Sequence, residues 1–101
     1  MNQELEDKLV AELKTIYDPE IPVNVYDLGL IYNLNEINGK LEVEMTLTAP
    51  GCPVADDIVA EIKAKMLGVD EIKEAYVNLV FDPPWSMEMM TEEAKLELGM
   101  L

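Results

Sequence analysis

The chain has 101 residues, half of them hydrophobic, and a formal net charge of −14 from 21 acidic and 7 basic residues. This length and composition predict a single folded domain, residues 1–101, with one modest core. The excess of carboxylates excludes a surface that neutralises nucleic-acid phosphates and disfavours binding to anionic membranes. No apolar run approaches the roughly 18 residues of a membrane span. A lone cysteine cannot form an internal disulfide, so we expect a cytoplasmic protein.

The sequence contains no histidine. The commonest general base, the partner of a Cys–His nucleophile pair and the commonest metal ligand are therefore all missing. A closed zinc site with four ligands is also disfavoured, because the chain offers only one soft ligand. An enzyme is consequently the weaker hypothesis from composition.

Residues 3–17 are predicted to form an amphipathic helix that ends before Pro19. The apolar residues at helical spacing are Leu5, Leu9, Leu13 and Ile16. Residues 18–29 then form a long loop with two prolines and three carboxylates, and loops of this length inside a compact domain are often functional. The alternative interpretation is that Asp18 and Asp27 only cap local turns.

Asn38-Gly39 predicts a two-residue turn between strands at 30–37 and 40–48. The pairs predicted on the core side of this hairpin are Leu34 with Val43, Tyr32 with Met45 and Leu30 with Leu47. The residues predicted to point the other way are Glu42, Glu44, Thr46 and Thr48. The same register places Thr48 opposite Gly29, so the irregular segments beyond these two residues are expected to be neighbours in space.

The second half of the chain predicts a helix over 53–67, a strand over 71–82 and a short helix over 91–99. Pro53 suits the first position of its helix, and Gly68 follows the end. The apolar positions that alternate along the strand are Ala75, Val77, Leu79 and Phe81. The order α-β-β-α-β-α predicts an α+β fold, a small two-layer domain with helices packed on a largely antiparallel three-stranded sheet.

Cys52 is predicted to cap the amino terminus of the helix over 53–67. Helix amino termini favour thiolates, the form of cysteine that attacks substrates and binds metals. The carboxylates of Asp56 and Asp57 and the net charge oppose a thiolate. A buried structural cysteine is therefore an equally good interpretation of these residues alone.

A metal site built on Cys52 would have an incomplete ligand set, because iron–sulfur clusters normally take four cysteine thiolates. A homodimer sharing a cluster, a bound small thiol or a client protein would have to supply the rest. The carboxylates available to contribute are those of Asp18, Glu20 and Asp27. A transient and exchangeable site, as a cluster carrier needs, is easier to build here than a permanent one.

Four stretches together resemble the metal–sulfur cluster assembly factors of the SufT type, a small domain that also occurs in a PaaD-like subunit of phenylacetate degradation. They are DPEIP at 18–22, YDLGLIY at 26–32, TLTAPGCP at 46–53 and DPPW at 82–85. The match follows the expected order over nearly the whole chain, and four ordered motifs are far more specific than one.

The resemblance implies an auxiliary factor in the maturation of iron–sulfur proteins, working without additional domains and relying on scaffold proteins and client apoproteins as partners. Its cargo would be a labile iron–sulfur cluster, iron or sulfide. The functional residues that it implies are Asp18, Glu20, Asp27, Thr48 and Cys52. Trp85 and Tyr26 would be structural or would face a partner.

Two other functions remain open at this stage. One is an accessory subunit of a multicomponent oxygenase acting on phenylacetyl-CoA, in which Cys52 is largely structural. The other is an enzyme that uses Cys52 as a nucleophile with Asp27 or Glu20 as acid or base. The lack of histidine and of nearby cations makes this enzyme the weakest of the three hypotheses.

Overall fold

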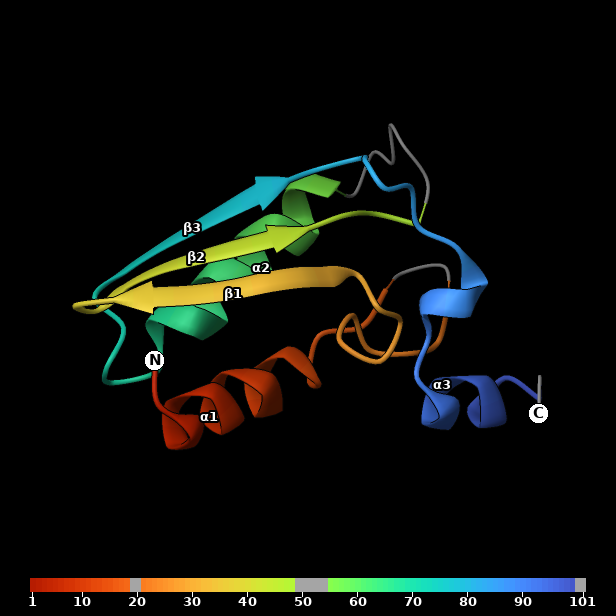
Figure 1. The fold of residues 1–101 in the computed structure, drawn as a ribbon, viewed down its shortest axis with the longest axis horizontal. Helices are drawn as coiled ribbons and strands as arrows, with labels where there is room; N and C mark the ends of the chain where they lie inside the picture. Colours follow the sequence, from red (N-terminus) through yellow and green to blue (C-terminus); the bar gives the residue numbers. More distant parts are fainter. Residues whose placement is uncertain (19–20, 49–54, 100–101) are drawn as a thin grey trace.

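The structure is a computed structural model, and it describes residues 1–18, 21–48 and 55–99. Its elements are α1 (Gln3–Leu13), β1 (Ile31–Ile37), β2 (Lys40–Met45), α2 (Ala55–Leu67), β3 (Glu74–Leu79), the 3-10 helix η1 (Met87–Met89) and α3 (Glu92–Glu97). The predicted α+β class and the order α-β-β-α-β-α are confirmed (Figure 1). Among the described residues, no helix is long and apolar enough to cross a lipid bilayer.

The three strands form one mixed sheet in the order β1-β2-β3. β1 and β2 are antiparallel around Asn38 and Gly39, whose positive φ angles of 53° and 85° are those that the predicted turn requires. β3 runs parallel to β2, so the prediction of a largely antiparallel sheet is wrong for this second pairing. The reason is that α2 packs against the sheet and returns the chain to the end where β2 begins (Figure 1).

The hairpin register is as predicted near the turn and shifts by one residue further along. Leu34 pairs with Val43, but Ile31 rather than Tyr32 pairs with Met45, because the register shifts between Ile31 and Asn33. Tyr32 is the extra residue of this β-bulge, and bulges re-aim side chains in this way. Its hydroxyl donates a hydrogen bond to the carbonyl oxygen of Pro83 (2.8 Å). This hydrogen bond links the bulge to the segment after β3. The turn sequence alone does not predict the shift in register.

The bulge also changes which residues are opposite each other at the end of the hairpin away from the turn. The backbone N–H of Thr46 donates to the carbonyl oxygen of Leu30 (2.9 Å), so Thr48 is not opposite Gly29. Thr46 is buried rather than outward-pointing. The two irregular segments nevertheless leave the sheet at the same end, since β1 begins where β2 finishes.

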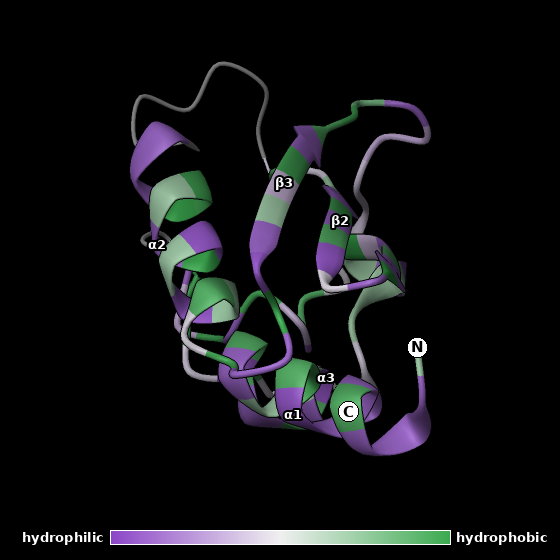
Figure 2. Cartoon of the chain, turned by 90° about the vertical axis from the view of Figure 1, so that its left-hand side faces the viewer, coloured by the Kyte–Doolittle hydropathy of each residue, from purple (hydrophilic) through white to green (hydrophobic). Residues whose placement is uncertain are grey.

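The core lies between the sheet and the helices. The predicted stripe of α1 and the residues after it is buried, as are alternate residues of β2 and the inner face of α2. These buried side chains include Leu5, Leu9, Leu13, Ile16, Leu41, Val43, Met45, Ile58, Ile62 and Met66. Figure 2 shows α2 beside the strands and both α1 and α3 below them. α3 therefore lies below the strands, attached to the loop that follows α1, and does not pack on a face of the sheet.

Five predicted elements are shorter in the structure, among them β1, which begins at Ile31, and β2, which ends at Met45 instead of residue 48. α1 ends at Leu13 instead of residue 17, because the chain turns back and the carbonyl oxygen of Ile16 accepts a hydrogen bond from the N–H of Val25 (2.8 Å). β3 covers Glu74–Leu79 only, and Phe81 is 47% exposed beyond its end.

The last helix begins and ends inside the predicted range. α3 is capped by Thr91, whose hydroxyl accepts from the N–H of Ala94 (3.2 Å). The predicted start of the second helix, Cys52 and Pro53, lies outside the described residues.

Candidate functional site

The loop that follows α1 reaches the end of β2 through Asp18. This carboxylate is buried, and its Oδ1 accepts a hydrogen bond from the backbone N–H of Ile21 (3.0 Å), as the turn-capping interpretation predicts. Its Oδ2 lies 3.5 Å from the hydroxyl of Thr48, at the outer limit of a hydrogen bond. Two predicted site residues that are 30 positions apart in sequence are thus brought together.

Asp27 is held by a reciprocal pair of hydrogen bonds with Asn24. The Asn24 amide nitrogen donates to Asp27 Oδ2, and the Asp27 backbone N–H donates to Asn24 Oδ1, each at 2.8 Å. Both residues are 8% exposed. The carbonyl oxygen of Asp27 also accepts from the N–H of Thr91 (2.9 Å), so the same residue attaches the loop to the start of α3.

Asn24 and Thr46 are two residues of this region that the sequence prediction missed. An asparagine three residues before an aspartate is a signal for such a side-chain-capped turn, and it predicts Asn24. Thr46 is 1% exposed, and its hydroxyl has no hydrogen-bond partner among the residues that the structure describes. The bulged register, which the sequence did not reveal, is what placed this hydroxyl inside.

Trp85 is hydrogen-bonded to the loop that follows α1. Its indole N–H donates a short hydrogen bond to the carbonyl oxygen of Leu28 (2.6 Å), which fastens the segment after β3 to the 18–29 loop. Tyr26 is half-buried, and the Lys14 ammonium lies 5.6 Å from the centre of its ring. This distance is within the range of a cation–π contact, so Tyr26 links the loop to the residue after α1.

A surface cavity of about 400 Å³ opens beside the Asn24–Asp27 pair. Its lining residues are Tyr17, Asn24, Asp27, Glu93, Leu96 and Glu97. The cavity is rich in carboxylates, yet no three of the described His, Cys, Asp and Glu residues are grouped so as to hold a metal ion. Cys52 and Glu20 lie outside the described residues, so their role and any ligand set that includes them stay predictions.

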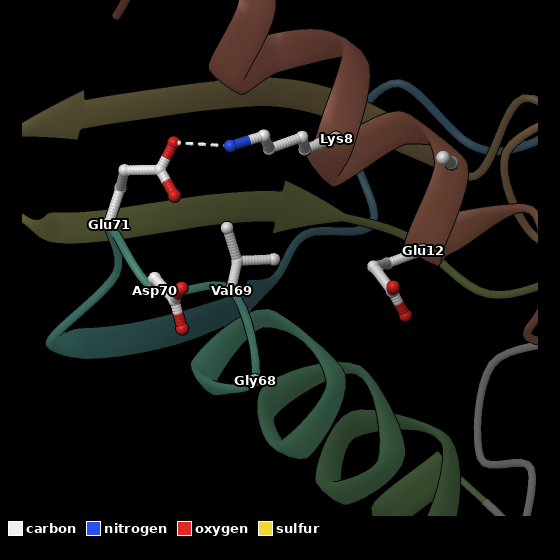
Figure 3. A pocket seen from close by; sticks show the side chains of 7 residues that line it. Lys8, Glu12, Gly68, Val69, Asp70 and Glu71 are labelled. Carbon is white, nitrogen blue, oxygen red and sulfur yellow. Dashed lines mark hydrogen bonds and ion pairs between the residues drawn. The ribbon is translucent and has the colours of Figure 1, made fainter.

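A second cavity, of about 320 Å³, lies between α1 and the segment that joins α2 to β3 (Figure 3). At its rim the Lys8 ammonium donates a hydrogen bond to Glu71 Oε2 (2.9 Å). This contact lowers the pKa of Glu71 and raises the pKa of Lys8. None of the predicted site residues lines this cavity.

The Lys8–Glu71 pair predicts a pH-dependent coupling. We expect a small favourable coupling energy near pH 7 from a double-mutant cycle of Lys8→Met and Glu71→Gln, small because both side chains are exposed. Since the pKa of Glu71 is lowered from 4.5, the coupling should be complete above pH 4.5 and disappear as the pH falls through the lower value in the folded state. Since the pKa of Lys8 is raised from 10.5, the coupling should also be complete below pH 10.5 and be lost as the pH rises through the raised value in the folded state.

Urea denaturation of the four proteins between pH 3 and pH 8 measures the acid side of this dependence. The cycle cancels the effect of each substitution on the overall net charge. A coupling energy that does not change across the acid range would contradict the assignment of this ion pair.

Comparisons with known proteins agree on one family. The family described as iron-sulfur cluster assembly protein matches residues 6–79. The chain is 51% identical to an Fe-S protein maturation auxiliary factor of Porphyromonas gingivalis, over all of both chains. It is 36% identical to the Fe-S protein maturation auxiliary factor YitW of Bacillus subtilis, over 98% of each chain. The crystal structure of a domain of unknown function from Bacillus anthracis has a TM-score of 0.88 and 40% identity, covering 98% of this chain and 95% of that one.

Proposed function

The chain belongs to the iron-sulfur cluster assembly protein family, and on this premise we propose that it is an auxiliary factor in the maturation of iron–sulfur proteins. Two proteins named as such factors support this role, because they are 51% and 36% identical to this chain over nearly its full length. Scaffold proteins and client apoproteins are the partners that the role requires.

Within that role, Cys52 makes the transient contact with the cargo, which is iron, sulfide or a cluster in transit. The observation that carries this proposal is the approach of Asp18 to Thr48, because Thr48 precedes Cys52 by only four residues in the sequence. A buried carboxylate is thus held against the strand end from which the cysteine segment continues. Asp18, Asp27 and Glu20 supply hard oxygen ligands that suit iron, and Cys52 supplies the single soft one.

The proposed contact is easily broken. One thiolate and a few carboxylates cannot enclose a cluster that needs four thiolates, so the remaining ligands come from the donor and then from the client. An incomplete set holds its cargo weakly, and weak holding favours release. The net charge of −14 further discourages a permanent anionic thiolate cluster on this chain.

The test is the activation of an apo iron–sulfur enzyme under anaerobic conditions, with iron, sulfide and either the wild-type protein or a Cys52 variant. Cys52→Ala and Cys52→Ser should both lower the rate of activation by about tenfold or more, the size of effect seen when residues around a metal site are removed. Thermal melts of both variants show whether the fold is retained.

The serine variant separates chemistry from packing. Serine is close to cysteine in size but forms no thiolate, so a role in packing alone predicts that Cys52→Ser activates the client normally. Activation by both variants at the wild-type rate would contradict the proposed handover through Cys52.

A further inference from the structure

We propose that the open edge of β3, together with the lysines around it, binds an extended acidic segment of a partner protein, which adds to the sheet as a fourth strand. The site lies where β2 and β3 begin, at the opposite end of the sheet from Thr48. It is therefore separate from the proposed cargo contact. β3 is the last strand in the order β1-β2-β3, and it runs along the rim of the sheet (Figure 1).

The backbone of β3 has one unused row of hydrogen-bonding groups. The N–H of Glu74 donates to Gly39 (3.1 Å) and the N–H of Val80 donates to Met45 (2.8 Å), so the even-numbered amides face β2. Alternation along a strand then turns the amides of the odd-numbered residues outward. These are Ala75, Val77 and Leu79, and no described strand pairs with them.

β3 lacks the backbone irregularities that often protect an edge strand, and its charged residues are Glu74 at its start and Lys73 just before it. Its pairing with β2 is regular over six residue pairs, and its sequence, EAYVNL, contains no lysine, proline or glycine. The other edge is protected, because β1 carries the bulge at Tyr32 and the chain's amino terminus lies 3.9 Å from Glu36. Of the two edges, β3 is the one whose geometry accepts an added strand.

Positive charge gathers beside this edge. A surface cavity of about 210 Å³ is lined by Lys63, Leu67, Lys73, Glu74, Ala75 and Tyr76. The ammonium of Lys40 lies 5.8 Å from the centre of the Tyr76 ring. Three of the seven basic residues of the chain are thus close to one strand edge. Two carboxylates are also local, because Glu74 lines the same cavity and Glu42 is the cross-strand partner of Tyr76. The three lysines outnumber them, and charges further away are screened beyond about 8 Å at physiological ionic strength.

Each face of an added strand would find one lysine and one apolar group, and the outer face also carries Glu74, which accepts a hydrogen bond from the Tyr76 hydroxyl (3.2 Å). Toward α2 these are Lys63 and Leu67, which lie four residues apart on the helix, and Leu67 is 42% exposed. On the outer face they are Lys40 and Tyr76, and Tyr76 is 44% exposed. A segment that mixes glutamate or aspartate with β-branched residues matches both faces.

A second copy of this chain fits the edge less well. Pairing two β3 edges symmetrically would bring the lysines of one copy against those of the other, and each copy carries a net charge of −14. The occupant is therefore a different molecule with local negative charge.

The experiment uses an acetylated and amidated octapeptide, Glu-Glu-Val-Val repeated twice, which as a strand presents both residue types on each face, added to the full chain at physiological salt. Calorimetry should show saturable binding, weakened about tenfold or more in the double variant with Lys63→Glu and Lys73→Glu, since loss of a close charge pair costs at least this factor. The matched control is Lys14→Glu with Lys95→Glu, which changes the net charge equally and should bind almost as wild type.

Hydrogen exchange identifies the mode of binding. The amides of Ala75, Val77 and Leu79 should exchange more slowly in the complex, because an added strand bonds to them. Absence of binding, equal weakening in both double variants, or binding without protection of these three amides would each overturn the proposal. Cys52→Ala should leave peptide binding unchanged, so the outcome is independent of the maturation assay.

Discussion

Replacing Gly29 with alanine is expected to destabilise the protein by about 2–5 kcal/mol, the sum of left-handed backbone strain and overpacking. Gly29 has a φ of 81°, which residues with a β-carbon rarely adopt. A β-carbon there would overlap the carbonyl oxygen of Met89 and lie 2.8 Å from its carbonyl carbon. Both contacts are backbone atoms, so no side-chain rotation relieves them.

The loss is large compared with the roughly 5–15 kcal/mol that a domain of this size has in total. It should appear as a fall in melting temperature of about 10 °C or more, measured by circular dichroism. Gly99→Ala is the matched control, because Gly99 has a φ of 75° but nothing within 4 Å of an added β-carbon. Gly99→Ala should therefore show the backbone strain alone, and equal effects of the two substitutions would refute the clash with Met89.

Asn24→Asp should destabilise the protein by about 2–4 kcal/mol at pH 7, because it places two buried carboxylates against each other. In the wild type the Asn24 amide nitrogen donates to Asp27 Oδ2 at 2.8 Å. The variant has no donor at this position, and both side chains are nine-tenths buried. Since Asp27 also bonds to Thr91, α3 should loosen along with the loop.

The cost of Asn24→Asp depends on pH with a definite sign. Repulsion raises the folded-state pKa of the carboxyl pair in the variant, so the penalty is complete above that raised pKa. It decreases as the pH falls below that raised pKa and is small near pH 4, close to the ordinary aspartate pKa of about 3.9, below which the unfolded chain is protonated as well. Urea denaturation of the variant and the wild type at pH 4, 5.5 and 7 measures this trend.

Gln3→Glu provides the control for this substitution. Gln3 Nε2 donates to Asp7 Oδ1 at 2.8 Å, so the change also replaces an amide donor with a carboxylate beside an aspartate. Both residues are exposed, and we expect an effect within about 0.5 kcal/mol. If Asn24→Asp were as mild as Gln3→Glu, burial would not be what makes the Asn24–Asp27 pair important.

Part of the geometry around the described site residues follows from local chemistry. Asp18 accepts the hydrogen bond of a local turn from Ile21, as the turn-capping alternative predicts, and the Trp85 indole is hydrogen-bonded to the carbonyl oxygen of Leu28. Asn24 was missed although its spacing from Asp27 carries the signal of a capped turn. The burial of Thr46 could not be predicted, because it depends on a β-bulge that no local sequence pattern indicates.

The sequence by itself determined the elements whose stability is local. The Asn38-Gly39 turn forms because few other residue pairs tolerate its positive φ angles, and the buried faces of α1 and α2 follow the spacing of apolar residues. The acidic composition likewise predicts that nucleic acid is not a partner.

Only the tertiary structure decided how these elements combine. α1 stops at Leu13 because Ile16 gains a backbone partner in Val25, and that partner exists only once the loop has folded back. β3 lies parallel to β2 because α2 must cover the sheet before the chain re-enters it. The meeting of Asp18 with Thr48, and the open β3 edge with its lysines, depend on such long-range contacts. The hairpin register predicted that the two loops are neighbours, but these particular contacts draw their free energy from residues distant in sequence, and no local pattern specifies them.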